Sequence, residues 1–217
     1  MPRRSRVVRK ERARHSTREE IVVSREGAKQ PQRFNPERAA RLDDPARFAY
    51  LPVADVLALL DAPQGATLVD FGTGTGTYAI EIARVRPDLR IVALDEQSEM
   101  LELVRAKLRE ESLPNVEPAA NDVLPSLRGR AERVLAINVL HELGDAALAD
   151  VRELLHLDGT VLFVDWNADV ERPIGPPRDH VYSPEQARRR LEGAGFIVRD
   201  EQRLLYHYAI VVQSGGN

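Results

Sequence analysis

Hydrophobic and polar positions follow two alternating patterns along this chain. Short apolar runs, typical of buried strands, are separated by segments in which apolar residues recur every three or four positions, typical of amphipathic helices. The runs occupy Thr67 to Phe71, Arg90 to Asp95, Val116 to Ala120, Arg133 to Asn138 and Thr160 to Asp165. Strands that alternate with helices favour a parallel sheet with helices on both faces.

Helical patterns fill the intervals between these runs. They cover Asn35 to Arg41 and Val53 to Leu60 before the first strand, and later segments begin near Tyr78, Ser98, Asp145 and Ser183. The helix near Asp145 is expected to end at Asp158-Gly159, because glycine commonly follows the last turn of a helix. Ser183 can cap the last helix, and Gln186 can reach back to complete a capping box.

Two adjacent strands close the chain, at Phe196 to Leu204 and Tyr208 to Gln213. Strands this close in sequence pair antiparallel, since a parallel pair needs a long crossover. We therefore predict an α/β fold with a doubly wound, mostly parallel seven-stranded sheet, Rossmann-like, with an antiparallel edge strand.

Charge divides the chain into two parts. Residues 1–33 hold eleven Arg or Lys against four Glu, whereas the whole chain has a formal net charge of −3. We predict a basic, disordered tail over 1–33 and one domain over 34–217. The tail is either a nucleic-acid or anionic-surface arm or a solvated extension. We favour the extension, because no aromatic residue interleaves with the charges to stack on bases.

The composition excludes several kinds of site and a membrane-spanning segment. The chain has no cysteine, which excludes disulfides, thiolate zinc sites and a cysteine nucleophile. No apolar stretch approaches the roughly 18 residues that cross a bilayer, so we expect no membrane span and a cytoplasmic protein.

A glycine-rich turn is the most informative motif. Leu68 to Tyr78 reads Leu-Val-Asp-Phe-Gly-Thr-Gly-Thr-Gly-Thr-Tyr, in which Asp70 ends an apolar run and Gly72, Gly74 and Gly76 follow at every second position. Glycine has no Cβ, so a ligand can lie against the backbone at the start of the next helix. A dinucleotide fingerprint would need its third glycine where Thr77 stands.

A second carboxylate stands about 20 residues beyond this turn. Asp95 ends the next apolar run and is followed by Glu96. Nucleotide-binding α/β units place at this point the acid that binds the ribose hydroxyls.

The Asp-x-Gly-x-Gly-x-Gly pattern resembles motif I of the class I S-adenosylmethionine-dependent methyltransferases, and the chain from Phe34 to Gln213 is most similar to the ubiquinone/menaquinone-biosynthesis-like, or type 11, members. The resemblance implies S-adenosylmethionine as cofactor. In that family the acid that ends the first strand and the backbone of the turn hold the amino-acid moiety. The implied contacts are Asp70 and Gly72, Gly74 and Gly76 at the methionine portion, Asp95 with Glu96 at the ribose, Asn121 and Asp122 around the adenine, and Asn138 below the sulfonium.

Two departures from this family bear on the methyl acceptor. Quinone-forming members carry Arg-Asn after the fourth strand, where this chain has Ile137-Asn138, and their Pro-Gly-Gly is here Asp158-Gly159-Thr160. The chain also lacks the Asn/Asp-Pro-Pro-aromatic motif of adenine and cytosine amino methyltransferases, and it lacks the two lysines of ribose 2′-O methyltransferases. We therefore expect a small-molecule acceptor and no nucleic-acid substrate, except through the tail.

Histidines are the candidate catalytic groups. His141 follows the fourth strand, and its ordinary pKa suits a general base near neutral pH; the alternative is a histidine that orients its neighbours. His180 is a weaker candidate, in a proline-rich segment that can fold over the site. Trp166, Tyr182 and Tyr206 wall the acceptor site or belong to the core. No histidine pair has the helical i, i+4 spacing of metal ligands, so we expect no metal.

Two other functions remain open from the sequence. A nicotinamide-dependent oxidoreductase would share the strand-turn-helix unit but lacks the third fingerprint glycine. A non-catalytic module could bind S-adenosylmethionine while the basic tail binds nucleic acid.

Overall fold

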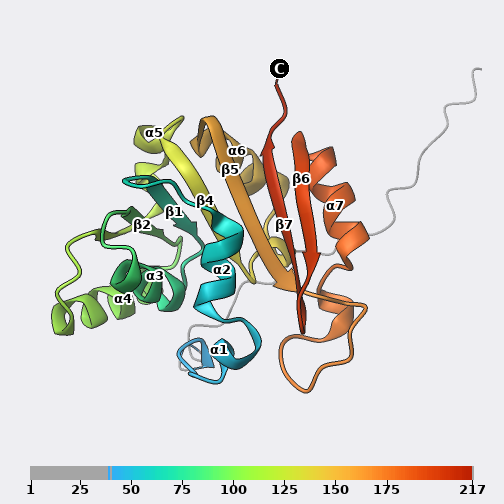
Figure 1. Cartoon of the computed structure of the whole chain (residues 1–217), viewed down its shortest axis with the longest axis horizontal. Coiled ribbons are helices and arrows are strands. Elements are labelled where there is room, and N and C mark those ends of the chain that lie inside the picture. The colour runs from blue at the N-terminus through green and yellow to red at the C-terminus, as the bar shows by residue number, and fades with distance from the viewer. Residues whose placement is uncertain (1–38, 40, 217) are drawn as a thin grey trace, which may run out of the picture. The chain divides into compact units, whose positions relative to one another are not determined.

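One sheet of seven strands, in the order β3-β2-β1-β4-β5-β7-β6, organises the described residues of this computed structural model (Figure 1). The structure describes residue 39 and residues 41–216. The strands are β1 (Thr67–Phe71), β2 (Arg90–Leu94), β3 (Val116–Ala119), β4 (Ala131–Ile137), β5 (Leu155–Trp166), β6 (Phe196–Arg203) and β7 (His207–Ser214). The predicted tail over 1–33 and most of the predicted helix over 35–41 lie outside the described residues.

Helices cover both faces of this sheet (Figure 1). They are α1 (Arg47–Tyr50), α2 (Val53–Leu60), α3 (Thr77–Val85), α4 (Ser98–Glu110), α5 (Leu124–Leu127), α6 (Asp145–Leu154) and α7 (Pro184–Gly193), with short 3₁₀ turns η2 (Asn121–Val123), η3 (Leu140–Glu142) and η4 (Arg178–His180). Buried residues of α2, α3 and α4 pack on one face, and those of α5, α6 and α7 pack on the other. The predicted doubly wound α/β fold is confirmed.

Parallel pairing runs from β3 through β2, β1 and β4 to β5, while β7 pairs antiparallel with both β5 and β6. The antiparallel pairing is thus confined to this end of the sheet, with β7 one place in from the edge strand β6. The strand order reverses between β1 and β4. Ligands of such sheets bind beyond the carboxyl ends of the strands at this reversal.

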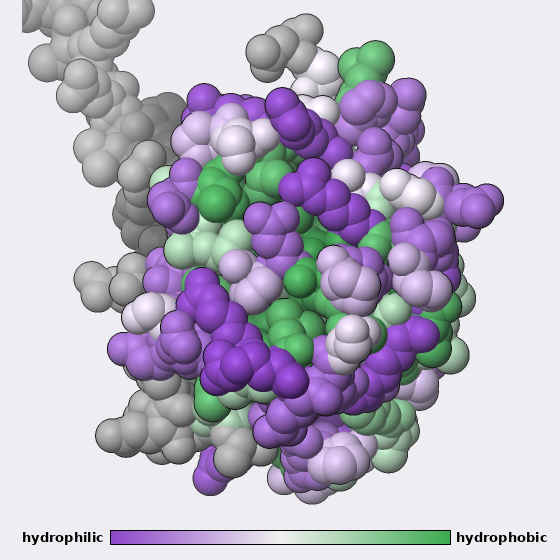
Figure 2. Space-filling view, turned by 90° about the vertical axis from the view of Figure 1, so that its left-hand side faces the viewer, coloured by the Kyte–Doolittle hydropathy of each residue, from purple (hydrophilic) through white to green (hydrophobic). Residues whose placement is uncertain are grey.

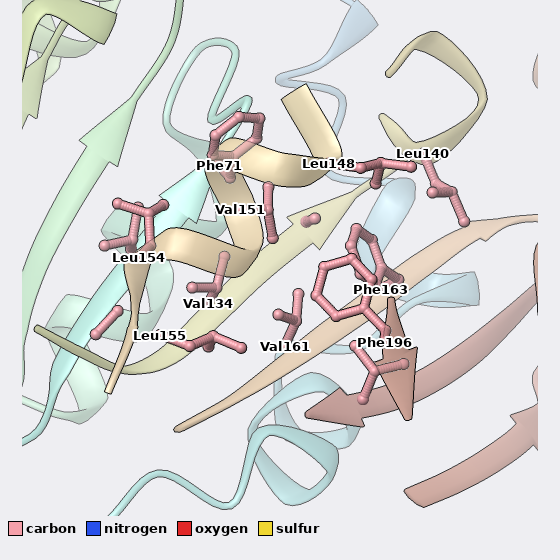
Figure 3. Packing of buried hydrophobic residues seen from close by; sticks show 14 of the residues in the cluster. Phe71, Val134, Leu140, Leu148, Val151, Leu154, Leu155, Val161, Phe163 and Phe196 are labelled. Atoms are coloured by element: carbon pink, nitrogen blue, oxygen red, sulfur yellow. The ribbon is translucent and has the colours of Figure 1, made fainter. Parts of the chain in front are cut away.

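Burial on both faces explains why the strands read as continuous apolar runs. Val134 of β4 and Val161 of β5 face α6, where Leu148, Val151 and Leu154 pack against them (Figure 3). Neighbouring strand residues face the other way: Leu68, Leu135 and Leu162 belong to the cluster under α2 and α3.

The boundary between α6 and β5 corrects the sequence prediction. The helix ends at Leu154, and Asp158-Gly159 lies within the strand instead of stopping the helix. A Cβ on Gly159 would lie 2.6 Å from the Ala131 carbonyl oxygen, so this glycine allows two strands to approach closely. The register shift between Ala131 and Arg133 marks the same irregularity.

Other boundaries agree with the sequence. The helix predicted over Val53 to Leu60 is confirmed, as is the capping box of α7, in which Ser183 Oγ accepts the Gln186 N–H at 3.2 Å and Gln186 Oε1 accepts the Ser183 N–H at 2.9 Å. The short elements η2 and α5 were not predicted. Over the part of the chain that the structure describes, no helix has the length and apolar character needed to cross a membrane.

Hydrophilic side chains dominate the face on the side of α4, with a smaller hydrophobic area in its centre (Figure 2). The pattern of α4 agrees with this view. Met100, Leu101 and Val104 are buried beneath the helix, whereas Glu99 and Glu102 are exposed.

Candidate active site

A pocket of about 480 Å³ lies beyond the carboxyl ends of β1, β2 and β4. Its lining comes from the segment before β1 (Leu42, Arg47), the glycine turn and α3 (Asp70, Phe71, Gly72, Thr73, Gly74, Thr77, Tyr78), the end of β2 and α4 (Leu94, Asp95, Glu96, Gln97, Met100), η2 (Asn121), and the segment from β4 into α6 (Ile137, Asn138, Val139, Glu142, Leu143, Gly144, Ala146, Ala147, Asp150). This is the position that the strand reversal predicts.

The three glycines of the turn differ in role. Gly72, Gly74 and Gly76 all have left-handed backbone, with φ of 73°, 57° and 77°. Gly72 and Gly74 line the pocket, as the resemblance implied, but Gly76 does not. A Cβ on Gly76 would lie 3.0 Å from a methyl of Val104, so this glycine lets α3 pack closely against α4.

Asp70 is buried at the end of β1, with 3% of its surface exposed. Thr73 Oγ1 donates a hydrogen bond of 2.6 Å to Asp70 Oδ2. Burial raises the pKa of Asp70 to about 6, an effect that Thr73 opposes and the charge of Asp95 reinforces. This carboxylate therefore gains from a cation placed beside it.

Arg47 is the one positively charged residue of the described lining, and no sequence motif marks it. Its Nη1 donates to the Leu42 carbonyl oxygen at 2.7 Å, and its guanidinium lies 5.3 Å from the centre of the Tyr78 ring. It comes from the short helix α1, which carries no motif. The pocket lining therefore includes both a buried carboxylate, Asp70, and a guanidinium, Arg47.

Asp95 ties the glycine turn to β2. Its Oδ2 accepts the Gly74 N–H at 2.8 Å and its Oδ1 accepts the Gln97 N–H at 2.9 Å. Burial raises the pKa of Asp95, which these two hydrogen bonds oppose. Each carboxylate oxygen keeps a lone pair for a further donor, such as a ligand hydroxyl.

Only some of the residues predicted to contact the adenosine portion line the pocket. Asn121 and Glu96 line the pocket, but Asp122, which is exposed on η2, does not. Asn138 lines it directly after β4, with a left-handed φ of 59°. The Asn138 N–H donates to the Val164 carbonyl at 2.7 Å, while the buried Asn138 Oδ1 has no hydrogen-bond partner.

His141 stands behind the pocket wall and pairs with a buried carboxylate. Its Nδ1 lies 2.9 Å from both carboxylate oxygens of Asp165, which also accepts the His141 backbone N–H at 3.0 Å. Its Nε2 lies 3.6 Å from Glu142 Oε1, and it is Glu142 that lines the pocket. Burial lowers the pKa of His141, but the charges of Asp165 and Glu142 outweigh this, so the net shift is upward.

The remaining candidates lie away from the lining. His180 is exposed on η4, and Trp166, Tyr182 and Tyr206 do not line this pocket. Trp166 packs against His207, with ring centres 4.1 Å apart. Burial lowers the pKa of His207 to about 4, as for a neutral core histidine. Within residues 41–216, no group of three or more acidic or histidine side chains is placed to hold a metal ion.

Comparison with known proteins identifies the kind of domain that contains this pocket. Residues 68–159 match the family model of a methyltransferase domain. A solved S-adenosylmethionine-dependent methyltransferase from Aquifex aeolicus is 26% identical, with a TM-score of 0.77 over 83% of this chain and 98% of that one. Residues 68–159 thus belong to a methyltransferase domain, and the chain has the fold of the class I S-adenosylmethionine-dependent methyltransferases.

Two curated relatives are similar to parts of this chain. The ribosomal RNA small subunit methyltransferase G of Actinobacillus succinogenes is 31% identical over 37% of this chain and 38% of its own length. The release factor glutamine methyltransferase of Escherichia coli is 27% identical over 62% of this chain and 46% of its own length. The chain thus spans less than half the length of these curated relatives.

The residues of the pocket fit the cofactor that the family and fold imply, S-adenosylmethionine. Its methionine portion carries an ammonium and a carboxylate, which match the opposite charges of Asp70 and Arg47. Asp95 offers the acceptor oxygens that ribose hydroxyls need. Asp70 next to a pyrophosphate would instead repel it, which argues against a dinucleotide.

Proposed function

We propose that this methyltransferase transfers a methyl group from S-adenosylmethionine to a small-molecule acceptor. The observation that carries the proposal is that buried Asp70, Arg47 and a left-handed glycine turn line one pocket. This donor set suits a zwitterionic amino-acid group, and the neighbouring Asp95 suits a ribose.

When bound, the cofactor supplies an activated methyl carbon, so the protein mainly positions the acceptor and excludes water. Asp70 and Arg47 would hold the amino-acid group, Asp95 the ribose hydroxyls, and Asn138 the floor beside the methyl group. Asn121 and Glu96 would border the adenosine.

We infer that His141 takes up the proton that a protic acceptor loses. Asp165 holds Nδ1, which leaves Nε2 on the side of Glu142 and the pocket. A proton from the acceptor would reach Nε2 through the Glu142 carboxylate. His141 thus acts through Glu142, and Asp165 fixes the tautomer of His141.

One sequence feature favours a small-molecule acceptor over a nucleic-acid base. The segment after β4 reads Asn138-Val139-Leu140-His141 and lacks the Pro-Pro-aromatic motif of methyltransferases that act on the amino groups of adenine or cytosine. A macromolecular acceptor is the second candidate, because the curated relatives are named for ribosomal RNA and release factor glutamine.

Transfer of labelled methyl groups separates these candidates. The protein is incubated with methyl-labelled S-adenosylmethionine and, in separate reactions, with a low-molecular-weight cell extract, purified ribosomal RNA and a protein fraction. The proposal predicts label in the small-molecule reaction. Label confined to RNA or protein would favour the second candidate, and no transfer despite tight cofactor binding would indicate a non-catalytic module.

A further inference from the structure

The pocket lining carries more negative charge than the cofactor neutralises. Five carboxylates line it, from Asp70, Asp95, Glu96, Glu142 and Asp150, against the single cation Arg47 of the described lining. S-adenosylmethionine carries a net charge of about +1, since its sulfonium adds to a zwitterion. The pocket therefore stays anionic after the cofactor is bound.

Two of these carboxylates stand apart from the cofactor contacts. Glu142 and Asp150 come from η3 and α6, beyond the end of β4, whereas Asp70 and Asp95 end β1 and β2. Apolar Leu143, Ala146 and Ala147 lie between them in the sequence and line the same pocket. This wall combines negative charge with apolar surface.

His141 contacts the Glu142 carboxylate on the side away from the pocket. His141 Nε2 lies 3.6 Å from Glu142 Oε1, and the other ring nitrogen is held at 2.9 Å by Asp165, whose side chain is fully buried. Because His141 is held by Asp165, it helps to keep the Glu142 carboxylate in place at the pocket surface.

A second hydrogen-bond acceptor lies at the start of the same segment. Asn138 Oδ1 is buried and has no partner in the described structure, although a buried acceptor ordinarily finds one. The left-handed backbone of Asn138 and its N–H bond to the Val164 carbonyl fix this residue beside the pocket. The amide oxygen therefore calls for a donor, and Glu142 adds negative charge to the lining of the same pocket.

We propose that the methyl acceptor is a cationic amine, whose N–H groups are bound by Glu142 and Asn138. This inference rests on the proposed function. An ammonium group offers three donors and a positive charge, whereas an alcohol offers one donor and no charge. A carboxylate or phosphate acceptor would be repelled by the anionic lining.

Methylation of the amine takes place in two steps, loss of a proton and then transfer of the methyl group. The ammonium first releases one proton to Glu142, from which it passes to His141 and then to solvent. The nitrogen lone pair then forms the N–C bond to the methyl group as the carbon–sulfur bond breaks. The products are a methylated ammonium ion and neutral S-adenosylhomocysteine.

Matched ligand series test the charge of the acceptor. Benzylamine, phenethylamine and butylamine, each beside the alcohol and the carboxylic acid of the same skeleton, are titrated calorimetrically into the protein saturated with S-adenosylhomocysteine. At least one amine should bind ten or more times more tightly than its matched alcohol and acid, and should be methylated when S-adenosylmethionine replaces the product. The inference is overturned if no amine exceeds its matched alcohol and acid.

Variants test the assignment to Glu142. Glu142→Gln should weaken binding of the preferred amine at least tenfold and leave alcohol binding unchanged, whereas Glu142→Asp should keep the preference for amines. Glu110→Gln, an exposed change at the end of α4, is the matched control. Amine binding by Glu142→Gln at the wild-type level would overturn the assignment. Failure of the wild type to bind S-adenosylhomocysteine would instead count against the proposed function itself.

Discussion

At the scale of single residues, the buried carboxyl of Asp70 links cofactor binding to pH. Its pKa is raised to about 6, and only its ionised form attracts the cofactor ammonium. Affinity for S-adenosylmethionine should therefore be full above pH 6 and fall below it, by about tenfold at pH 5 relative to pH 7. Calorimetry at both pH values measures this.

A variant isolates the origin of that pH dependence. Asp70→Asn should bind more weakly at pH 7 and lose the pH dependence, whereas Asp179→Asn, an exposed change on η4, should behave as the wild type. A wild-type affinity that is equal at pH 5 and pH 7 would contradict the role of Asp70.

The raised pKa of His141 leads to a second predicted pH effect, on the rate of methyl transfer. Asp165 and Glu142 raise its pKa above the ordinary 6.5 in spite of burial, and only neutral His141 accepts a proton. The rate of methyl transfer should therefore rise with pH through that raised pKa. His141→Gln should lower the rate by roughly 10² to 10⁴ and abolish this pH dependence, with cofactor affinity nearly unchanged.

The partner of His141 provides a control that a purely structural role would not satisfy. Asp165→Asn removes the charge that raises the pKa of His141, so the pH profile should move to lower pH. If His141→Gln keeps more than about a third of the wild-type rate with an unchanged pH profile, His141 does not take up the proton.

Motifs predicted part of the pocket lining. Asp70, Gly72 and Asp95 follow strand ends in a recognisable spacing, and the structure brings them to one pocket. Arg47 has no such spacing, because its helix precedes the sheet and meets the pocket through tertiary packing. The pairing of His141 with Asp165 joins residues 24 positions apart across neighbouring strand ends, which no local pattern reveals.

At the scale of elements, the turn after β1 depends on Gly72 for two reasons. Its φ is +73°, and a Cβ there would lie 2.8 Å from Val139 Cγ1. Gly129 has a similar φ of +68°, but a Cβ there would meet nothing within 4 Å. Gly72→Ala should therefore lower the free energy of unfolding by about 2 to 4 kcal/mol, against about 1 kcal/mol for Gly129→Ala.

Urea denaturation of both alanine variants checks this difference. Equal losses would show that the Val139 contact relaxes without cost and that backbone conformation alone matters. The gap between the variants is more informative than either value, since both share the cost of a left-handed alanine.

Periodicity predicted most elements because the central strands are buried on both faces and each long helix is buried on one face. It failed at Asp158-Gly159, where glycine serves a close approach of β5 to β4 and not the end of a helix. It also missed η2 and α5, which are three and four residues long and too short to show a period.

At the scale of the whole molecule, the basic segment over 1–33 is predicted to contribute little to the stability of the domain. A chain that begins at Phe34 should keep its cofactor affinity and its melting temperature, because the removed segment has few apolar residues to bury. Calorimetric melting of the two chains checks this. A decrease beyond about 5 °C, which for this size means more than about 1 kcal/mol, would show that the segment packs on the domain.

Calorimetric titration with S-adenosylmethionine and, separately, with NAD tests the central claim most directly. The opposite charges of Asp70 and Arg47, with Asp95 beside them, predict that S-adenosylmethionine binds and NAD does not. Asp95→Ala should weaken S-adenosylmethionine binding by about 1.5 to 3 kcal/mol through loss of charged hydrogen bonds. NAD binding as tightly as S-adenosylmethionine would contradict the assignment of this pocket to a methyltransferase.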